Sequence, residues 1–306
     1  MNQSVYSSAG SYAETIVQLT HIMFVAAAVI TLLVVVLTAI ALFAKPSWKS
    51  KLSKERVVVW GGIAFPVVTL TILLIYGFMV LSMADLQIEE DESVQISVVG
   101  EQWWWRFTYT AEDGTTFETA NELRIPTDKP IVLRLTSADV IHSFWIPAYG
   151  GKLDMIPGRE NVMKIEVNKP GVYRGQCAEY CGGAHALMSM YSVAMPQEEF
   201  DAWLKSESAD AASSADAKGK QIFLGNGCGS CHTIRGTTAS GTIGPDLTHV
   251  GSRISLAAGT LRTSKENFAG WIANHKQIKP ENKMPGYDYL SDVDVEQLAT
   301  FLSELK

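Results

Sequence analysis

The chain has 306 residues, a formal net charge of −7 and 47% hydrophobic residues. This length exceeds one typical domain and so excludes a single small fold. The hydrophobic residues are unevenly distributed, and the four cysteines fall into two pairs, at positions 177 and 181 and at positions 228 and 231.

Two uncharged apolar blocks near the N-terminus predict membrane-spanning helices. Residues 22–44 and 57–83 contain no Asp, Glu, Lys or Arg. Each block reaches the ~20 residues that a helix needs to cross a bilayer. We place the helices at about 17–44 and 57–83, within an N-terminal segment formed by residues 1–90. A buried helix of a soluble protein is the weaker explanation, because two such blocks flank a short charged loop.

The distribution of charge predicts how the two helices are oriented. Five basic residues and one acid, Glu55, lie between residues 45 and 56, whereas the first 21 residues contain no Lys or Arg. Basic loops stay in the cytoplasm, so the acidic segment after the second helix and everything beyond it should lie outside. The first block lacks a cleavage site and a preceding basic run, so we interpret it as a retained anchor and not as a signal peptide.

Residues 91–204 are predicted to form an all-β domain. Apolar side chains alternate in residues 131–135 and 163–167, as in half-buried strands, and Gly and Pro turn signals separate such segments. Regularly spaced short strands favour a sandwich or a barrel. The run Gln102-Trp103-Trp104-Trp105 lies in this domain. By itself, such a run is typical of a packed core or of a membrane interface.

One short loop of this domain contains a set of soft metal ligands. Cys177, Cys181, His185 and Met188 follow one another at spacings of four, four and three residues, and His142 lies upstream. Thiolate and thioether ligands select copper or iron–sulfur clusters over hard cations, while imidazole suits copper and zinc alike. Two cysteines, two histidines and one methionine can hold two copper ions.

Two alternatives remain open on the cysteine spacing alone. A cysteine pair in an exported domain is also compatible with a disulfide. Two cysteines and a histidine are likewise compatible with a tetrahedral zinc site. Zinc would leave Met188 unexplained, so the complete set favours a dinuclear copper centre.

The ligand pattern closely resembles the dinuclear copper A centre of cytochrome c oxidase subunit two. The resemblance rests on Asp139-x-x-His142-Ser-Phe-Trp and Cys177-x-Glu179-x-Cys181-x-x-x-His185-x-x-Met188. It implies a cupredoxin-like Greek-key fold, thiolates that bridge the two coppers and one histidine on each copper. Met188 and the carbonyl of Glu179 would be the weak ligands. The resemblance also implies a magnesium ion shared with the catalytic subunit through the Glu179 carboxylate.

The same resemblance implies roles for other regions of the chain. In that family, an exposed tryptophan near the copper receives electrons, and Trp103 is the candidate here, whereas Trp104 and Trp105 would be structural. The two helices would pack, among lipids, against the catalytic subunit I and other oxidase subunits. The copper domain would face the periplasm of a bacterial inner membrane. Relatives have a carboxylate near the start of the second helix where this chain has Val57, and the nearby Glu55 is interpreted as an ordinary loop charge.

The composition changes after residue 204. Residues 205–216 are small and polar, which predicts a flexible linker that spans roughly 20 Å on average. Residues 217–306 contain Cys228-Gly-Ser-Cys231-His232, the attachment signature for c-type haem. A thioredoxin-like cysteine pair is the alternative, but no βαβ pattern surrounds the motif. We therefore expect an all-α cytochrome c domain with His232 bound to the iron.

Three residues are candidates for the second iron ligand, namely His249, His275 and Met284. Met284 is favoured because it lies in a polar Pro/Gly loop before a predicted C-terminal helix, where it has no helix core to fill. A His/Met ligand pair raises the potential of cytochromes c. The segment Gly244-Pro-Asp-Leu247 resembles the cytochrome c segment whose proline carbonyl orients the haem-binding histidine, so Pro245 should accept a hydrogen bond from His232.

These features predict a multi-domain membrane protein with a two-helix transmembrane hairpin, a cupredoxin-like domain and a cytochrome c domain. The expected function is electron transfer from the haem to copper A, and on to haem in a catalytic subunit that reduces dioxygen to water. The donor would be a cytochrome c or a quinol-oxidising complex, and no nucleic acid is expected as a partner. The alternatives are the equivalent subunit of a copper-A nitric oxide reductase, or a copper storage or delivery protein. Storage would leave the haem motif without a purpose.

Overall fold

The computed structural model describes residues 3–83, 93–111, 113–211 and 217–306. The chain divides into two compact units. One unit contains residues 14–87. The other contains the N-terminal residues through Ala13 together with the chain from residue 88 to the C-terminus.

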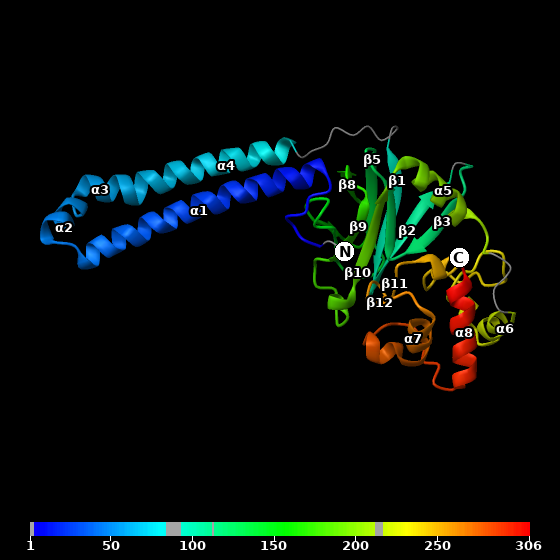
Figure 1. Ribbon diagram of the computed structural model, residues 1–306. Helices are drawn as coiled ribbons and strands as arrows, with labels where there is room; N and C mark the ends of the chain where they lie inside the picture. The colour runs from blue at the N-terminus through cyan, green and yellow to red at the C-terminus, as the bar shows by residue number, and fades with distance from the viewer. Residues whose placement is uncertain (1–2, 84–92, 112, 212–216) are drawn as a thin grey trace. The chain divides into compact units, whose positions relative to one another are not determined.

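The first unit is helical, and two of its helices are long and apolar enough to cross a membrane. These are α1 and the continuous helical stretch Glu55–Ser82. Figure 1 shows α1 and α4 running side by side, with short helices between them. The elements are α1 (Ser11–Phe43), α2 (Pro46–Leu52), α3 (Glu55–Val59), the π-helical turn η1 (Trp60–Ala64) and α4 (Phe65–Met83).

Two local features of these helices follow from the sequence. Helix α1 begins six residues before the predicted start, because Ser11 and Glu14 form the Ser-x-x-Glu pattern that is typical of a helix N-terminus. The π-helical turn η1 contains Gly61 and Gly62 and lies just before Pro66. Proline cannot donate the regular backbone hydrogen bond to the preceding turn, which accounts for the irregular helix at this point.

The second unit contains a sandwich of two five-stranded sheets. One sheet has the order β3-β2-β1-β5-β8, and the other has the order β4-β10-β9-β6-β7. Pairing is parallel between β1 and β5 and between β4 and β10, and antiparallel between the other neighbours. The strands are β1 (Val94–Glu101), β2 (Trp104–Thr110), β3 (Thr116–Ala120), β4 (Glu122–Pro126), β5 (Pro130–Ser137), β6 (His142–Trp145), β7 (Leu153–Met155), β8 (Asn161–Glu166), β9 (Gly171–Cys177) and β10 (Ser189–Met195).

The sandwich core forms because apolar side chains alternate along the strands. In β2, Trp105, Phe107 and Tyr109 are buried between the sheets, whereas the residues between them are partly exposed. Helix α5 (Gln197–Ser208) closes the core with Phe200. This helix includes the first four residues of the predicted linker 205–216, whose residues 212–216 lie outside the described regions of the chain.

The N-terminal residues also belong to the sandwich. Ala9 is buried in its core, its N–H donates to the Ala148 carbonyl at 2.8 Å, and its carbonyl accepts from the Asn168 N–H at 2.7 Å. At Gly10, a Cβ would lie 2.2 Å from the Glu166 carbonyl oxygen, so only glycine fits there. The predicted N-terminal segment of residues 1–90 is therefore divided between the two units.

The C-terminal region is mainly helical and has its own core. Helix α6 packs on α8 at Gly219, where a Cβ would lie 2.4 Å from the Gln297 carbonyl oxygen, so glycine allows the close approach. Phe223, Ile272 and Phe301 lie in the buried cluster between the helices. The elements are α6 (Ala217–Gly225), the 3₁₀ turns η4 (Cys228–Ser230) and η5 (Val250–Ser252), the paired strands β11 (Ser255–Leu256) and β12 (Leu261–Arg262), α7 (Lys265–Ile278) and α8 (Asp292–Glu304).

Candidate copper and haem sites

The two cysteines of the predicted copper motif are buried and unbonded. Cys177 is the last residue of β9 and Cys181 lies in the loop that follows. Their sulfurs are 3.8 Å apart, and both cysteines are free. A disulfide requires about 2.03–2.05 Å between the sulfurs. The disulfide alternative therefore does not describe this structure.

The other predicted ligands converge on this pair of sulfurs. His142 Nδ1 lies 3.8 Å from Cys177 Sγ, and His185 Nδ1 lies 3.6 Å from Cys181 Sγ. Met188 Sδ is 3.8 Å from Cys181 Sγ, and the Glu179 carbonyl oxygen is 3.1 Å from Cys177 Sγ. Soft sulfur and imidazole donors in this number fit a pair of copper ions better than one zinc ion.

Strand pairing brings these donors together. His142 begins β6, which pairs with β9 so that Phe144 lies opposite Cys177. Met188 directly precedes β10, the other neighbour of β9, and its carbonyl accepts from the Cys177 N–H at 2.9 Å. A Cβ at Gly100 of β1 would lie 2.8 Å from the His142 ring, so glycine makes room for the imidazole.

Asp139 orients His142. The Nε2 atom of His142 lies 2.9 Å from Asp139 Oδ1, which leaves Nδ1 directed toward Cys177. Hydrogen bonds of this kind fix the ring of a metal-binding histidine. Burial opposes the charged carboxylate, but hydrogen bonds from His142 and from the Gln102 N–H outweigh it and lower the pKa of Asp139. The sequence pattern Asp-x-x-His contains the signal for this contact.

The two thiols form a strongly coupled pair. The hydrogen bond with Cys181 lowers the pKa of Cys177 to about 4 against the effect of burial. The same bond, together with burial, raises the pKa of Cys181. Because cysteine binds metal ions as the thiolate, the lowered pKa of Cys177 favours metal binding at this pair.

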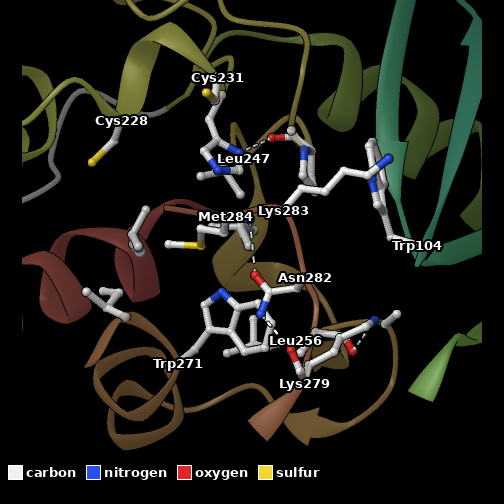
Figure 2. A pocket seen from close by; sticks show the side chains of 18 of the residues that line it. Trp104, Cys228, Cys231, Leu247, Leu256, Trp271, Lys279, Asn282, Lys283 and Met284 are labelled. Atoms are coloured by element: carbon white, nitrogen blue, oxygen red, sulfur yellow. Dashed lines mark hydrogen bonds between the residues drawn. The ribbon is translucent and has the colours of Figure 1, made fainter. Parts of the chain in front are cut away.

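A cavity in the C-terminal region brings together the predicted haem-binding residues. Cys228, Cys231, His232 and Met284 all line it, and Figure 2 shows the two cysteines and Met284 around the same space. His232 Nδ1 lies 2.7 Å from the Pro245 carbonyl oxygen. Apolar side chains complete the wall, among them Phe223, Leu247, Leu256, Phe268, Ile272, Leu298 and Leu302.

Two details of the cavity fit a haem group. Arg253 lines it and is 8% exposed, and its Nε atom has no hydrogen-bond partner in the described regions of the chain. A buried cation beside apolar walls suits a group that has both apolar surface and carboxylates, as haem has. Burial lowers the pKa of His232, which favours the neutral imidazole that metals bind.

Comparisons with known proteins match the regions that contain the two sites. The family model described as "Cytochrome C oxidase subunit II, periplasmic domain" matches residues 112–194, and the cytochrome c family model matches residues 217–306. Cytochrome c oxidase subunit 2 of Alkalihalophilus pseudofirmus is 39% identical over 71% of this chain and 62% of that protein. The subunit 2 of Bacillus sp. strain PS3 is 31% identical over 83% of this chain and 75% of that protein.

This chain belongs to the cytochrome c oxidase subunit 2 family. It has a fused C-terminal cytochrome c domain. The solved periplasmic domain of subunit II of cytochrome oxidase from Bradyrhizobium japonicum is 34% identical, with a TM-score of 0.35, over 37% of this chain and 92% of that chain. The chain spans 62% of the length of the Alkalihalophilus relative.

The exposure of Trp103 in the tryptophan run differs from what the resemblance implies. The resemblance implies an exposed Trp103, whereas the structure buries it to 6% exposure. Its indole N–H donates to the Cys181 carbonyl at 3.0 Å, and its own carbonyl accepts from Lys279 of the cytochrome c domain. Because side chains alternate along β2, Trp105 points into the sandwich core and Trp104 lines the haem cavity (Figure 2).

Of the three candidates for the second iron ligand, only Met284 lines the cavity in the portion of the chain that the structure describes. His249 Nε2 bonds instead to the Ala209 carbonyl at 3.0 Å. His275 is buried, and its Nε2 donates to the Met284 carbonyl at 3.1 Å. It therefore supports the loop that contains Met284.

Sequence reasoning missed Lys279, which is 3% exposed. Burial lowers its pKa to about 7. A single lysine between Ile278 and Pro280, at the end of α7, gives no signal of this burial. The side chain of Glu179, which the resemblance links to magnesium, is exposed beside the copper motif.

Proposed function

We propose that this chain is the electron-transfer subunit of a terminal respiratory oxidase. It would pass electrons from a c-type haem to dinuclear copper A, and on to haem in a catalytic subunit that reduces dioxygen to water. One observation supports this most strongly. Two imidazoles and a thioether lie around two neighbouring thiols. The same compact unit contains a cavity lined by Cys228, Cys231, His232 and Met284.

The proposed copper ligands are two thiolates, two imidazoles, one thioether and one backbone carbonyl. Bound copper supplies a centre that accepts and releases one electron with little change in geometry. The sandwich strands fix the ligand positions, and Asp139 holds the ring of His142, so the protein needs little reorganisation between redox states. The ligands are His142, Cys177, Glu179 through its carbonyl, Cys181, His185 and Met188.

The proposed haem site uses the second cysteine pair. Cys228 and Cys231 would form the thioether links, and His232 and Met284 would bind the iron. The Pro245 carbonyl orients His232, and the apolar wall would exclude water from a bound haem. A His/Met pair gives a relatively high potential, which suits a donor to copper.

The proposed assembly follows from the apolar helices and from the family. The helices α1 and α4 would anchor the chain in a bacterial inner membrane beside subunit I, with residues 91–204 and 217–306 on the periplasmic side. Glu179 would reach a magnesium ion shared with subunit I. A cytochrome c or a quinol-oxidising complex would reduce the haem.

A reductive titration of the purified complex tests the relay. Haem and near-infrared copper bands are followed together, and a rapid-mixing experiment then follows how electrons divide between them. A relay predicts that a reduced haem loses its electron to copper. Two centres that never exchange electrons would instead support copper storage. Nitric oxide reduction by the copurified catalytic subunit would support the reductase alternative.

A further inference from the structure

A six-residue segment of the cytochrome c domain lies against the segment that contains most of the proposed copper ligands. We call this segment, residues 177–188, the copper loop. The six-residue segment is residues 279–284, which ends at Met284, and we call it the haem loop. Lys279 Nζ donates to the Trp103 carbonyl at 2.5 Å and to the Leu187 carbonyl at 3.0 Å. Lys283 Nζ pairs with Asp139 Oδ2 at 3.2 Å. The segment thus joins the predicted iron ligand to the surroundings of the copper site.

Lys279 is the buried member of these contacts. Its third acceptor is the Ala257 carbonyl at 3.4 Å, and it forms no ion pair with any described residue. Lysine is almost never fully buried unless its nitrogen has partners. Both the neutral amine and the ammonium ion can donate to two carbonyls, so the contact persists in either protonation state.

The two carbonyls belong to the segments that hold the copper ligands. Trp103 and Gln102 both donate to the Cys181 carbonyl, at 3.0 Å and 2.9 Å. Leu187 directly precedes Met188 and ends the 3₁₀ turn that begins at His185. Lys279 therefore connects the haem loop to the backbone of Trp103 and of Leu187, both of which lie next to proposed copper ligands.

We propose that Lys279 is a positioning residue that locks the haem loop onto the copper loop, so that electron transfer from haem to copper takes place from one docked position. The inference rests on the proposed relay function. One electron leaves the reduced haem and enters the oxidised copper pair, and no bond or proton changes. The other interdomain lysine, Lys283, is 62% exposed in its side chain, and exposed ion pairs contribute little.

The test is a Lys279→Met variant of the full chain in its complete oxidase. Methionine keeps much of the buried volume but leaves the Trp103 and Leu187 carbonyls without this donor. An electron is injected photochemically into the haem, and haem oxidation and copper reduction are timed. Hydrogen exchange of residues 279–284 is measured separately. Loss of buried hydrogen bonds of this kind corresponds to about a tenfold change in an equilibrium, so we expect amide exchange about tenfold faster and slower electron transfer.

The matched control is Lys265→Met, which removes an exposed lysine of α7 that pairs with Glu296 within the cytochrome c domain. We expect the control to transfer electrons like the parent protein. Both variants should keep the haem spectrum and the near-infrared copper bands, because Lys279 and Lys265 bind neither group.

Three results would overturn the inference: unchanged transfer and exchange in Lys279→Met, an equal slowing in Lys265→Met, or slowing with no change in exchange. If Lys279→Met loses its haem or copper bands, Lys279→Gln replaces it. Glutamine keeps a shorter N–H donor, and a smaller slowing is then expected, with an unchanged rate as the contradiction. Absence of transfer in the parent protein would refute the relay itself, which distinguishes the two failures.

Discussion

Replacing Asp139 with alanine should weaken copper binding without removing any ligand. In the structure, Asp139 accepts from His142 at 2.9 Å and from the Gln102 N–H at 2.8 Å. Loss of the hydrogen-bonding partner of a metal-binding histidine typically reduces affinity by about 10- to 100-fold. This corresponds to about 1.4–2.7 kcal/mol. Because the Gln102 N–H also loses its acceptor, we expect an effect near the upper limit.

The measurement is a competition titration of the full chain in detergent against a copper chelator, followed by the visible and near-infrared copper bands. Asp139→Asn keeps one acceptor oxygen for His142, so its affinity should fall less, by about tenfold. The matched control is Asp154→Ala, which removes an exposed acid that lies 3.9 Å from Lys152.

Asp139 also pairs with Lys283 of the cytochrome c domain, so a second control separates the two roles. Lys283→Met should leave copper affinity unchanged if Asp139 acts through His142. Equal affinity of the parent protein and Asp139→Ala would refute the orienting role. Equal losses in Asp139→Ala and Lys283→Met would show that interdomain docking, and not His142, controls copper retention.

Three further predictions concern the ligands and their supports. Met188→Leu should keep both coppers but change their potential, because a weak ligand tunes the site more than it holds the metal; loss of one copper equivalent in metal analysis would contradict this. Met284→His should lower the haem potential in a redox titration, and an unchanged optical spectrum would mean that Met284 is not the ligand. Gly244→Ala should impair haem binding, because a Cβ there would lie 2.5 Å from His232 Cε1. Gly270→Ala, which meets no atom within 4 Å, is its control, and equal haem content in the two variants would refute the steric argument.

The sequence indicated which donor residues would lie close together, because metal ligands must meet in space and short segments preserve that closeness as residue spacing. Cys177, Cys181, His185 and Met188 lie within residues 177–188, and Cys228, Cys231 and His232 lie within residues 228–232. His142 comes from another strand, and its Asp-x-x-His pattern connects it to the site. The resemblance implied a structural role for Trp105, which lies in the core of the sandwich.

The contacts between the copper and cytochrome c domains could not be predicted in this way. Burial of Trp103 and Lys279 depends on how two separately folded surfaces meet, and neither residue lies in a periodic pattern that encodes that meeting. The start of α1 was placed too late, because the apolar block alone does not mark the polar Ser11 and Glu14 at the helix N-terminus.

The burial of Ala9 in the sandwich has a consequence for folding. Chain segments on both sides of the two apolar helices contribute to one β domain, so that domain is complete only when residues 3–10 have packed against it. A fragment that starts at β1 would lack these contacts, and fusing residues 3–10 back onto it should restore its packing.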